Sequence, residues 1–147
     1  MAFRFGLESV LKHRSRLEEL AQRDFALAQA AVDEELRKLE AMYQRLDEVR
    51  DEIASAQSES RLEDVRESEH FIIGHKIRIE QVRMHARELL RVAEEKQEEL
   101  ILAAQERKVL DKLRERRLAE YKEWLNRMEA KAADDQTQMR QAWGKRR

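Results

Sequence analysis

Apolar residues recur every seven positions along the first part of the chain. One heptad position carries Phe25, Val32, Leu39, Leu46 and Ile53, and a second, three residues further on, carries Ala28, Glu35, Met42, Val49 and Ala56. Nine of these ten residues are apolar, which is typical of one helix of a coiled coil. Before Phe25 the apolar stripe continues with a shifted phase, because a 3.6-residue turn drifts against a seven-residue repeat. The pattern predicts a helix over about residues 3–57.

The second half of the chain carries a weaker heptad pattern. Its seam contains Ile72, Ile79, Val82, Ala86, Leu89, Ala93, Leu100, Leu110, Tyr121 and Trp124, and polar residues such as His75, Lys96, Arg107, Arg114 and Arg117 interrupt it. This pattern predicts a helix over about residues 69–138, followed by a frayed tail. The core that we expect between the two helices consists of Phe25, Val32, Leu39, Met42, Leu46, Val49, Ile53, Ile79, Val82, Leu89, Leu100 and Leu110.

A polar, serine-rich connector of residues 57–68, QSESRLEDVRES, separates the two patterns. Ser60 followed by Glu63 has the form of a capping box, which starts a helix. Two seams of similar length most simply fold back on each other. We therefore predict an all-α fold, a long two-helix antiparallel coiled-coil hairpin that forms a single domain over residues 1–147. A continuous helix in a parallel dimer is the competing arrangement.

The composition supports long helices and excludes several other classes. The 147 residues include no proline, three glycines and 41% charged residues, whereas disorder usually brings proline and glycine and lacks an apolar repeat. Cysteine is absent, which excludes disulfides and thiolate sites. No window approaches the run of about 20 apolar residues that spans a membrane, and the start is too charged for a secretory signal. We expect a cytoplasmic protein.

The residue patterns predict that the protein is not an enzyme. Its four histidines, His13, His70, His75 and His85, have no pair at the helical spacing of a metal site. Phosphate-binding loops and nucleophile elbows are also missing from the sequence, and a two-helix fold offers no concave site for convergent groups. We therefore expect no catalytic residue, no metal and no cofactor.

Charge is segregated along the chain. Residues 1–23 carry five bases and three acids, residues 24–69 carry six bases and 14 acids, and residues 107–147 carry 13 bases and seven acids. In an antiparallel hairpin the two basic segments meet at one end, which favours a different partner for each end. A basic run over residues 107–122 could track phosphates, but Asp111, Glu115 and Glu120 interrupt it, so we do not predict nucleic-acid binding.

Two stretches resemble the FliJ family of flagellar type III export proteins. The start, FRFGLESVLKHRSRLEELAQRDFALAQA, is similar to the family's N-terminal F-x-F-x-L-x-x-[VL]-L run through Phe3, Phe5, Leu7, Val10 and Leu11. The stretch ERKVLDKLRERRLAEYKEWLNRMEAKAADD is similar to the family's C-terminal helix through Lys108, Lys112, Leu113, Arg116, Arg117 and Tyr121. The resemblance covers nearly the whole chain.

This resemblance implies a non-enzymatic coiled-coil stalk. Family members place the end that carries both termini in the pore of the hexameric flagellar export ATPase (FliI-type), promote its assembly and activity, and link it to the export gate protein (FlhA-type) and to export chaperones. The implied place is the cytoplasmic face of the inner membrane at the flagellar base, without direct membrane insertion. The candidate ring-contact residues are Arg107, Lys108, Lys112, Arg114, Arg116, Arg117 and Tyr121.

The resemblance also implies a contact with the export gate early in the second helix. The family's apolar motif there has the form F-[IV]-x-x-L-x-x-x-I, and Phe71, Ile72 and Ile79 match it, whereas His75 stands at the leucine position. The candidate gate-contact residues are Phe71, Ile72, Ile73 and His75. Ile72 and Ile79 lie on the seam and are expected in the core, so Phe71 and Ile73 are the better docking candidates.

A second hypothesis of a different class stays open at this point. A long coiled coil can also be a self-associating scaffold or a holdase-like chaperone. In a stable dimer of this kind, the apolar seam is buried between the two chains. A monomer with one basic end favours the export component, and a stable parallel dimer favours the scaffold.

Overall fold

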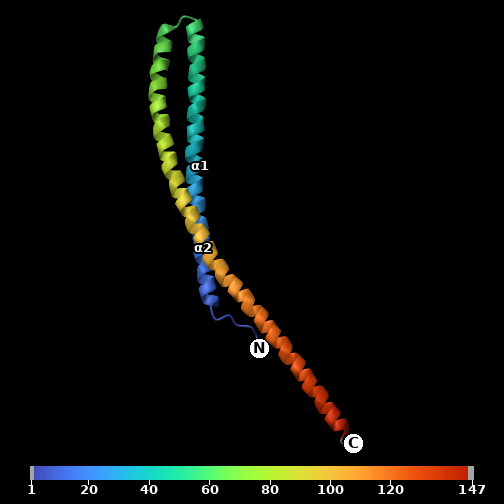
Figure 1. The fold of residues 1–147 in the computed structure, drawn as a ribbon. Helices are drawn as coiled ribbons and strands as arrows, with labels where there is room; N and C mark the ends of the chain where they lie inside the picture. Colours follow the sequence, from blue (N-terminus) through green and yellow to red (C-terminus); the bar gives the residue numbers. More distant parts are fainter. Residues whose placement is uncertain (1, 146–147) are drawn as a thin grey trace. The chain divides into compact units, whose positions relative to one another are not determined.

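The computed structural model describes residues 2–145, and two helices account for nearly all of them. Helix α1 runs from Glu8 to Ser58 and helix α2 from Leu62 to Lys145, and no β-strand is present in this range. A short loop joins the two helices, which run antiparallel where they pack together (Figure 1). The predicted all-α helical hairpin is confirmed.

Packing divides the chain into two compact units. Unit 2 is Glu19–Leu102, which contains the loop between the helices, and unit 1 is Met1–Glu18 together with Ala103–Arg147. Each unit therefore contains a stretch of both helices. The expectation of a single domain stays a prediction.

The connector in unit 2 is shorter than the predicted residues 57–68, because α2 begins at Leu62 and not near residue 69. Ser60 has a φ of 61°, and the amide of Arg61 donates to the carbonyl oxygen of Ala56 at 3.0 Å while that of Ser60 donates to Gln57 at 3.2 Å. This is the Schellman end of a helix, with the left-handed residue at Ser60. Ser60 therefore ends α1, and the predicted capping box does not start α2.

Burial explains why α2 starts early. Val65 is buried, as is Ala56 on α1, so the apolar packing continues up to the loop. Glu63 and Asp64 in the first turn of α2 suit the positive end of the helix dipole. The polar composition of residues 57–68 thus reflects exposed helical positions rather than a long loop.

The core of unit 2 is a single layer of side chains between two helices. Of the predicted core residues, Val32, Leu46, Val49 and Ile79 are buried, and Phe25, Leu39, Met42, Ile53, Val82, Leu89 and Leu100 are half-buried. Partial exposure follows from the architecture, because two helices cannot enclose a side chain from all sides. Ala86 and Ala93 are also buried, and beside Ala86 the seam leaves a groove of about 200 Å³ between Leu36 and Leu90.

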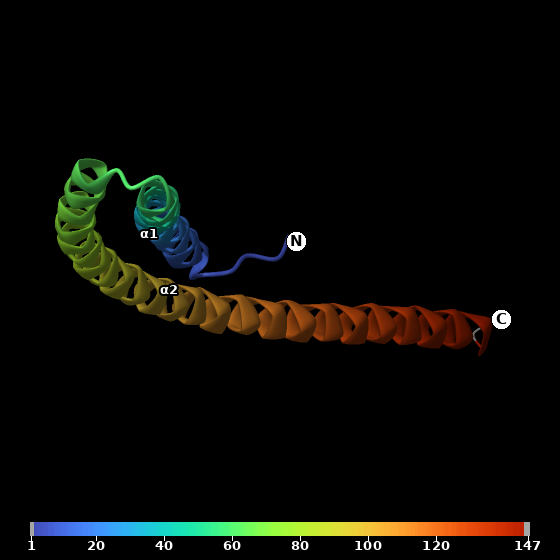
Figure 2. The ribbon, with the colours of Figure 1, turned by 90° about the horizontal axis from the view of Figure 1, so that it is seen from above.

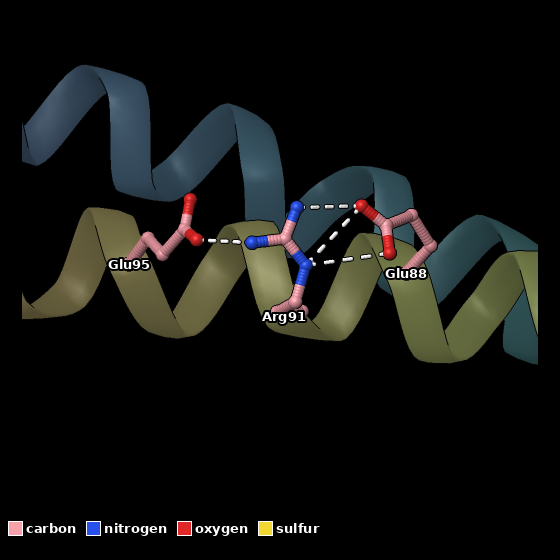
Figure 3. A network of polar contacts seen from close by, with 3 residues as sticks. All are labelled: Glu88, Arg91 and Glu95. Atoms are coloured by element: carbon pink, nitrogen blue, oxygen red, sulfur yellow. Dashed lines mark hydrogen bonds and ion pairs between the residues drawn. The ribbon is translucent and has the colours of Figure 1, made fainter.

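Residues 88–95 on the outer face of α2 in unit 2 carry charged side chains that pair with one another. Figure 3 shows Arg91 between Glu88 and Glu95, with Arg91 Nη2 donating to Glu88 Oε1 at 2.6 Å. The hydrogen bond from Arg91, aided by its charge, lowers the pKa of Glu88 from its ordinary value. The pair therefore contributes to the stability of the folded chain near neutral pH, and this contribution is lost as the pH falls through the lowered pKa of Glu88.

Unit 1 begins with a non-helical N-terminal segment, residues 2–7, visible as the thin blue end in Figure 2. The predicted start of the helix near residue 3 is therefore wrong, since α1 begins at Glu8. Phe5 is buried, and the Phe3 ring lies 5.6 Å from that of Tyr121 on α2. The apolar stripe that predicted a longer helix instead packs this segment against α2. The predicted core residue Leu110 is half-buried in unit 1.

The last part of α2 has no second helix beside it. Every residue from 126 to 145 is exposed, and α2 continues to Lys145, past the predicted end near residue 138 (Figure 1). The expected frayed tail is therefore wrong for residues 139–145, which are helical. Residues 146 and 147 lie outside the described residues.

Candidate partner-binding surfaces

Ion pairs between the helices hold unit 1 together. The guanidinium of Arg107 donates to Glu18 on α1 and to Asp111 on its own helix. These two side chains across the seam are largely covered, with 27% of Arg107 and 14% of Glu18 exposed. The hydrogen bond to Glu18 raises the pKa of Arg107 above its ordinary value, so this guanidinium stays charged at any pH near neutral.

Two further ion pairs link the same stretches. Arg114 Nε donates to Glu8 Oε2 at 3.1 Å, and Arg14 Nη1 donates to Glu106 Oε2 at 2.5 Å. Both pairs are part-buried, which protects them from screening better than a fully exposed pair. Arg107 and Arg114 therefore both form ion pairs with carboxylates on α1.

Two other candidates for the ring contact hold the N-terminal segment. The Arg117 guanidinium lies over the ring of Phe5, 5.7 Å from its centroid. Tyr121 packs between Phe3 and Trp124, whose ring centroid is 6.0 Å away. These cation–π and aromatic contacts give both residues a structural role.

Lys108, Lys112 and Arg116 form a different group, which we call the outer basic row. All three are exposed and have no ion-pair partner among residues 2–145. They follow one another at intervals of four residues and therefore lie along one face of α2. Val109, beside the row, is also exposed, at 66%. Of the seven candidate residues, these three are available to a partner.

The candidate gate contact in unit 2 is largely folded into the seam. His75 is buried, with 7% exposed, and its Nε2 lies 2.7 Å from the carbonyl oxygen of Met42. Because a carbonyl only accepts, Nε2 carries the proton. Phe71 stacks on the His75 ring at 5.0 Å, and the guanidinium groups of Arg45 and Arg78 lie within 6 Å of Phe71.

Exposed apolar side chains lie on the outward face of α2 instead. Ile72 is half-buried, whereas Ile73 is 61% exposed. Ile77 and Met84, which our reading of the sequence did not include, are 58% and 63% exposed. Ile77 follows Ile73 by four residues and Met84 follows Ile77 by seven, which places the three side chains on one face, and this spacing was the signal available in the sequence. We call Ile73, Ile77 and Met84 the outer apolar row.

Replacing His75 by leucine is expected to leave stability unchanged or to raise the thermal midpoint by a few degrees. Met42 lies inside α1, so its carbonyl keeps the helical hydrogen bond from the residue four further on when histidine is removed. Leucine also buries more apolar surface in the seam. Circular dichroism during heating measures the midpoint.

The matched control is His75→Asp, which places a carboxylate against the Met42 carbonyl oxygen. A buried acceptor without a donor costs about 1–3 kcal/mol or more, so this variant should melt well below the wild type. A leucine variant that melts as low as the aspartate variant would show that the histidine hydrogen bond itself stabilises the hairpin.

In residues 2–145, no group of histidine, aspartate and glutamate side chains is arranged to hold a metal ion. Within the same range, neither helix contains a stretch that is apolar enough to cross a membrane.

Comparison with known proteins decides the family. The model of a family described as flagellar FliJ protein matches residues 3–147, which is essentially the whole chain. The chain belongs to the FliJ family. No curated protein and no solved structure matches it. FliJ proteins are non-catalytic components of flagellar protein export, so this FliJ protein is a flagellar export component.

Proposed function

We propose that this FliJ protein is a stalk for the flagellar export ATPase, enters its hexameric ring, and promotes its assembly and activity. The stalk also connects the ATPase to the export gate protein and to export chaperones, in the cytoplasm at the inner membrane beneath the flagellum. Membership of the FliJ family supports this function. The sorting of the basic residues in unit 1 is the observation that carries it.

Four of the seven candidate ring-contact residues hold unit 1 together, and three form the outer basic row. These four residues connect the two helices and the N-terminal segment within unit 1. Lys108, Lys112 and Arg116 present three charges that have no ion-pair partner among residues 2–145. Such a cationic row suits an acidic lining around a pore, because charge complementarity speeds association and fixes orientation.

For the gate, we propose the outer apolar row rather than Phe71. The Phe71 ring is engaged by His75 and two arginines, so releasing it would break contacts within unit 2. Ile73, Ile77 and Met84 are already exposed. Exposed apolar side chains that share a helix face are typical of a protein-binding surface.

Assembly of the cognate export ATPase tests the stalk proposal. Mass photometry of the ATPase should show more hexamers when the wild-type chain is added. A variant with Lys108, Lys112 and Arg116 replaced by glutamate should lose most of this effect, because the charge of the row is reversed.

The matched control reverses three exposed charges in unit 2, with Arg66, Lys76 and Arg87 replaced by glutamate. This control changes the net charge by the same amount and should still increase the number of hexamers, since the three residues lie in unit 2 and outside the outer basic row. If both variants assemble hexamers equally well, the outer basic row does not contact the ring.

A further inference from the structure

The uncovered end of α2 carries an apolar stripe without a partner. Trp124, Met128, Met139 and Trp143 are 46%, 48%, 66% and 76% exposed. With Ala132 between them, they are spaced by four, seven or eleven residues and share one face of the helix. Helices in proteins owe most of their stability to packing of such a face, so an uncovered stripe over five turns favours a partner.

The two ends of this segment carry a similar order of residues when they are read in opposite directions. Read forward, residues 124–128 are Trp-Leu-Asn-Arg-Met, and read backward, residues 143–139 are Trp-Ala-Gln-Arg-Met. Two identical helices placed antiparallel about a two-fold axis bring such positions to the same level. Trp124 of one copy then lies level with Trp143 of the other, and Met128 lies level with Met139.

Charges in the middle of the segment fit the same arrangement. Asp135 interrupts the apolar stripe, and neither Asp135 nor Lys131 has an ion-pair partner among the described residues. Both lie on the same side of the stripe. Because a two-fold axis preserves that side, Lys131 of one copy comes within about one residue's rise of Asp135 of the other.

We propose that the segment of residues 124–143 is a self-association surface, through which two copies of this chain pair antiparallel. Each copy contributes four large apolar side chains and one half of two symmetric ion pairs. The interface is small compared with a stable dimer, so the pairing is weak and depends on concentration. It leaves the seams of both hairpins intact and does not rest on the proposed function.

A membrane surface is the less suitable occupant. An anionic bilayer favours helices whose polar face is rich in lysine and arginine. Here Glu129, Asp134 and Asp135 accompany the basic residues along the segment. Both the acids and the reversed order of residues favour a second copy.

Sedimentation of the full chain over a range of concentrations tests the association. We expect a reversible dimer for the wild type and a tenfold or greater loss of affinity in Met139→Glu. The matched control is Leu27→Glu, because Leu27 is similarly exposed, at 71%, and lies in unit 2. A chain that stays monomeric, or that loses association only in the Leu27 variant, would overturn the proposal.

Disulfide trapping tests the antiparallel register, and the absence of cysteine makes single-cysteine variants unambiguous. A cysteine at Ala132 lies about 4.5 Å along the axis from its copy, close enough to bridge, whereas one at Met128 lies about 16 Å away. We expect dimers from the Ala132→Cys variant, none from Met128→Cys alone, and dimers from Met128→Cys mixed with Met139→Cys. Self-crosslinking at Met128 would indicate parallel pairing and contradict the proposal.

A Trp124→Phe variant, which keeps Trp143 as the only tryptophan, distinguishes a second copy of the chain from a membrane surface as the occupant of the stripe. Its emission should shift to shorter wavelength as protein concentration rises, because Trp143 becomes covered. Vesicles with a third of anionic lipid should cause no further shift at low protein concentration. A shift only with these vesicles, and none with protein concentration, would assign the stripe to a membrane surface and overturn the self-association.

Discussion

Replacing Leu46 by alanine is expected to destabilise the hairpin by about 3 kcal/mol, within the 2–5 kcal/mol usual for such changes. Leu46 is 5% exposed in the centre of the seam of unit 2. The variant loses buried apolar surface and leaves a cavity in the seam between the two helices. Urea unfolding followed by circular dichroism measures the loss.

The matched control is Leu27→Ala, in the same helix and the same unit. Leu27 is 71% exposed, so its truncation should change the free energy of unfolding by less than about 0.5 kcal/mol. If the two variants were equally stable, the seam would not be the core of this hairpin.

Changing Ile73 and Ile77 together to aspartate is expected to weaken binding to the export gate protein at least tenfold. Both side chains are more than half exposed, so the change leaves the seam intact while it places two charges in the docking surface. Surface plasmon resonance with the soluble domain of the gate protein measures the affinity, and an unchanged melting curve shows that the hairpin is intact.

The control here is Phe71→Leu, which keeps an apolar residue beside His75. It should weaken gate binding far less than the double aspartate change, because Phe71 is engaged within unit 2. The opposite ranking, with Phe71 decisive and the isoleucines dispensable, would restore Phe71 as the docking residue.

The heptad pattern predicted the helices and the seam because burial of apolar side chains is the dominant favourable term in folding. The pattern also separates the basic residues at seam positions from those between seam positions, a distinction that was absent from our predictions. Arg107, Arg114 and Arg117 interrupt the seam of α2, and Tyr121 continues it, so all four point toward the other elements of unit 1. Lys108, Lys112 and Arg116 fall between seam positions and face outward.

Other features depend on contacts between residues far apart in the sequence, which the heptad repeat does not specify. Glu8 and Glu18 meet their arginines only through the register between the helices, which the repeat alone leaves open. The N-terminal segment has the same apolar spacing as a helix, but Phe3 and Phe5 pack on α2 beside the start of α1. His75 was a polar interruption in the sequence, and its burial is explained by the Met42 carbonyl oxygen, which accepts a hydrogen bond from Nε2.

The rate of ATP hydrolysis by the cognate export ATPase tests the stalk function most directly. The rate should rise to a plateau as the wild-type chain is added, and the glutamate variant of Lys108, Lys112 and Arg116 should lose at least nine-tenths of the rise. The control with Arg66, Lys76 and Arg87 replaced should stimulate like the wild type. No stimulation by the wild type would contradict the stalk function, and full stimulation by the row variant would contradict the role of the outer basic row.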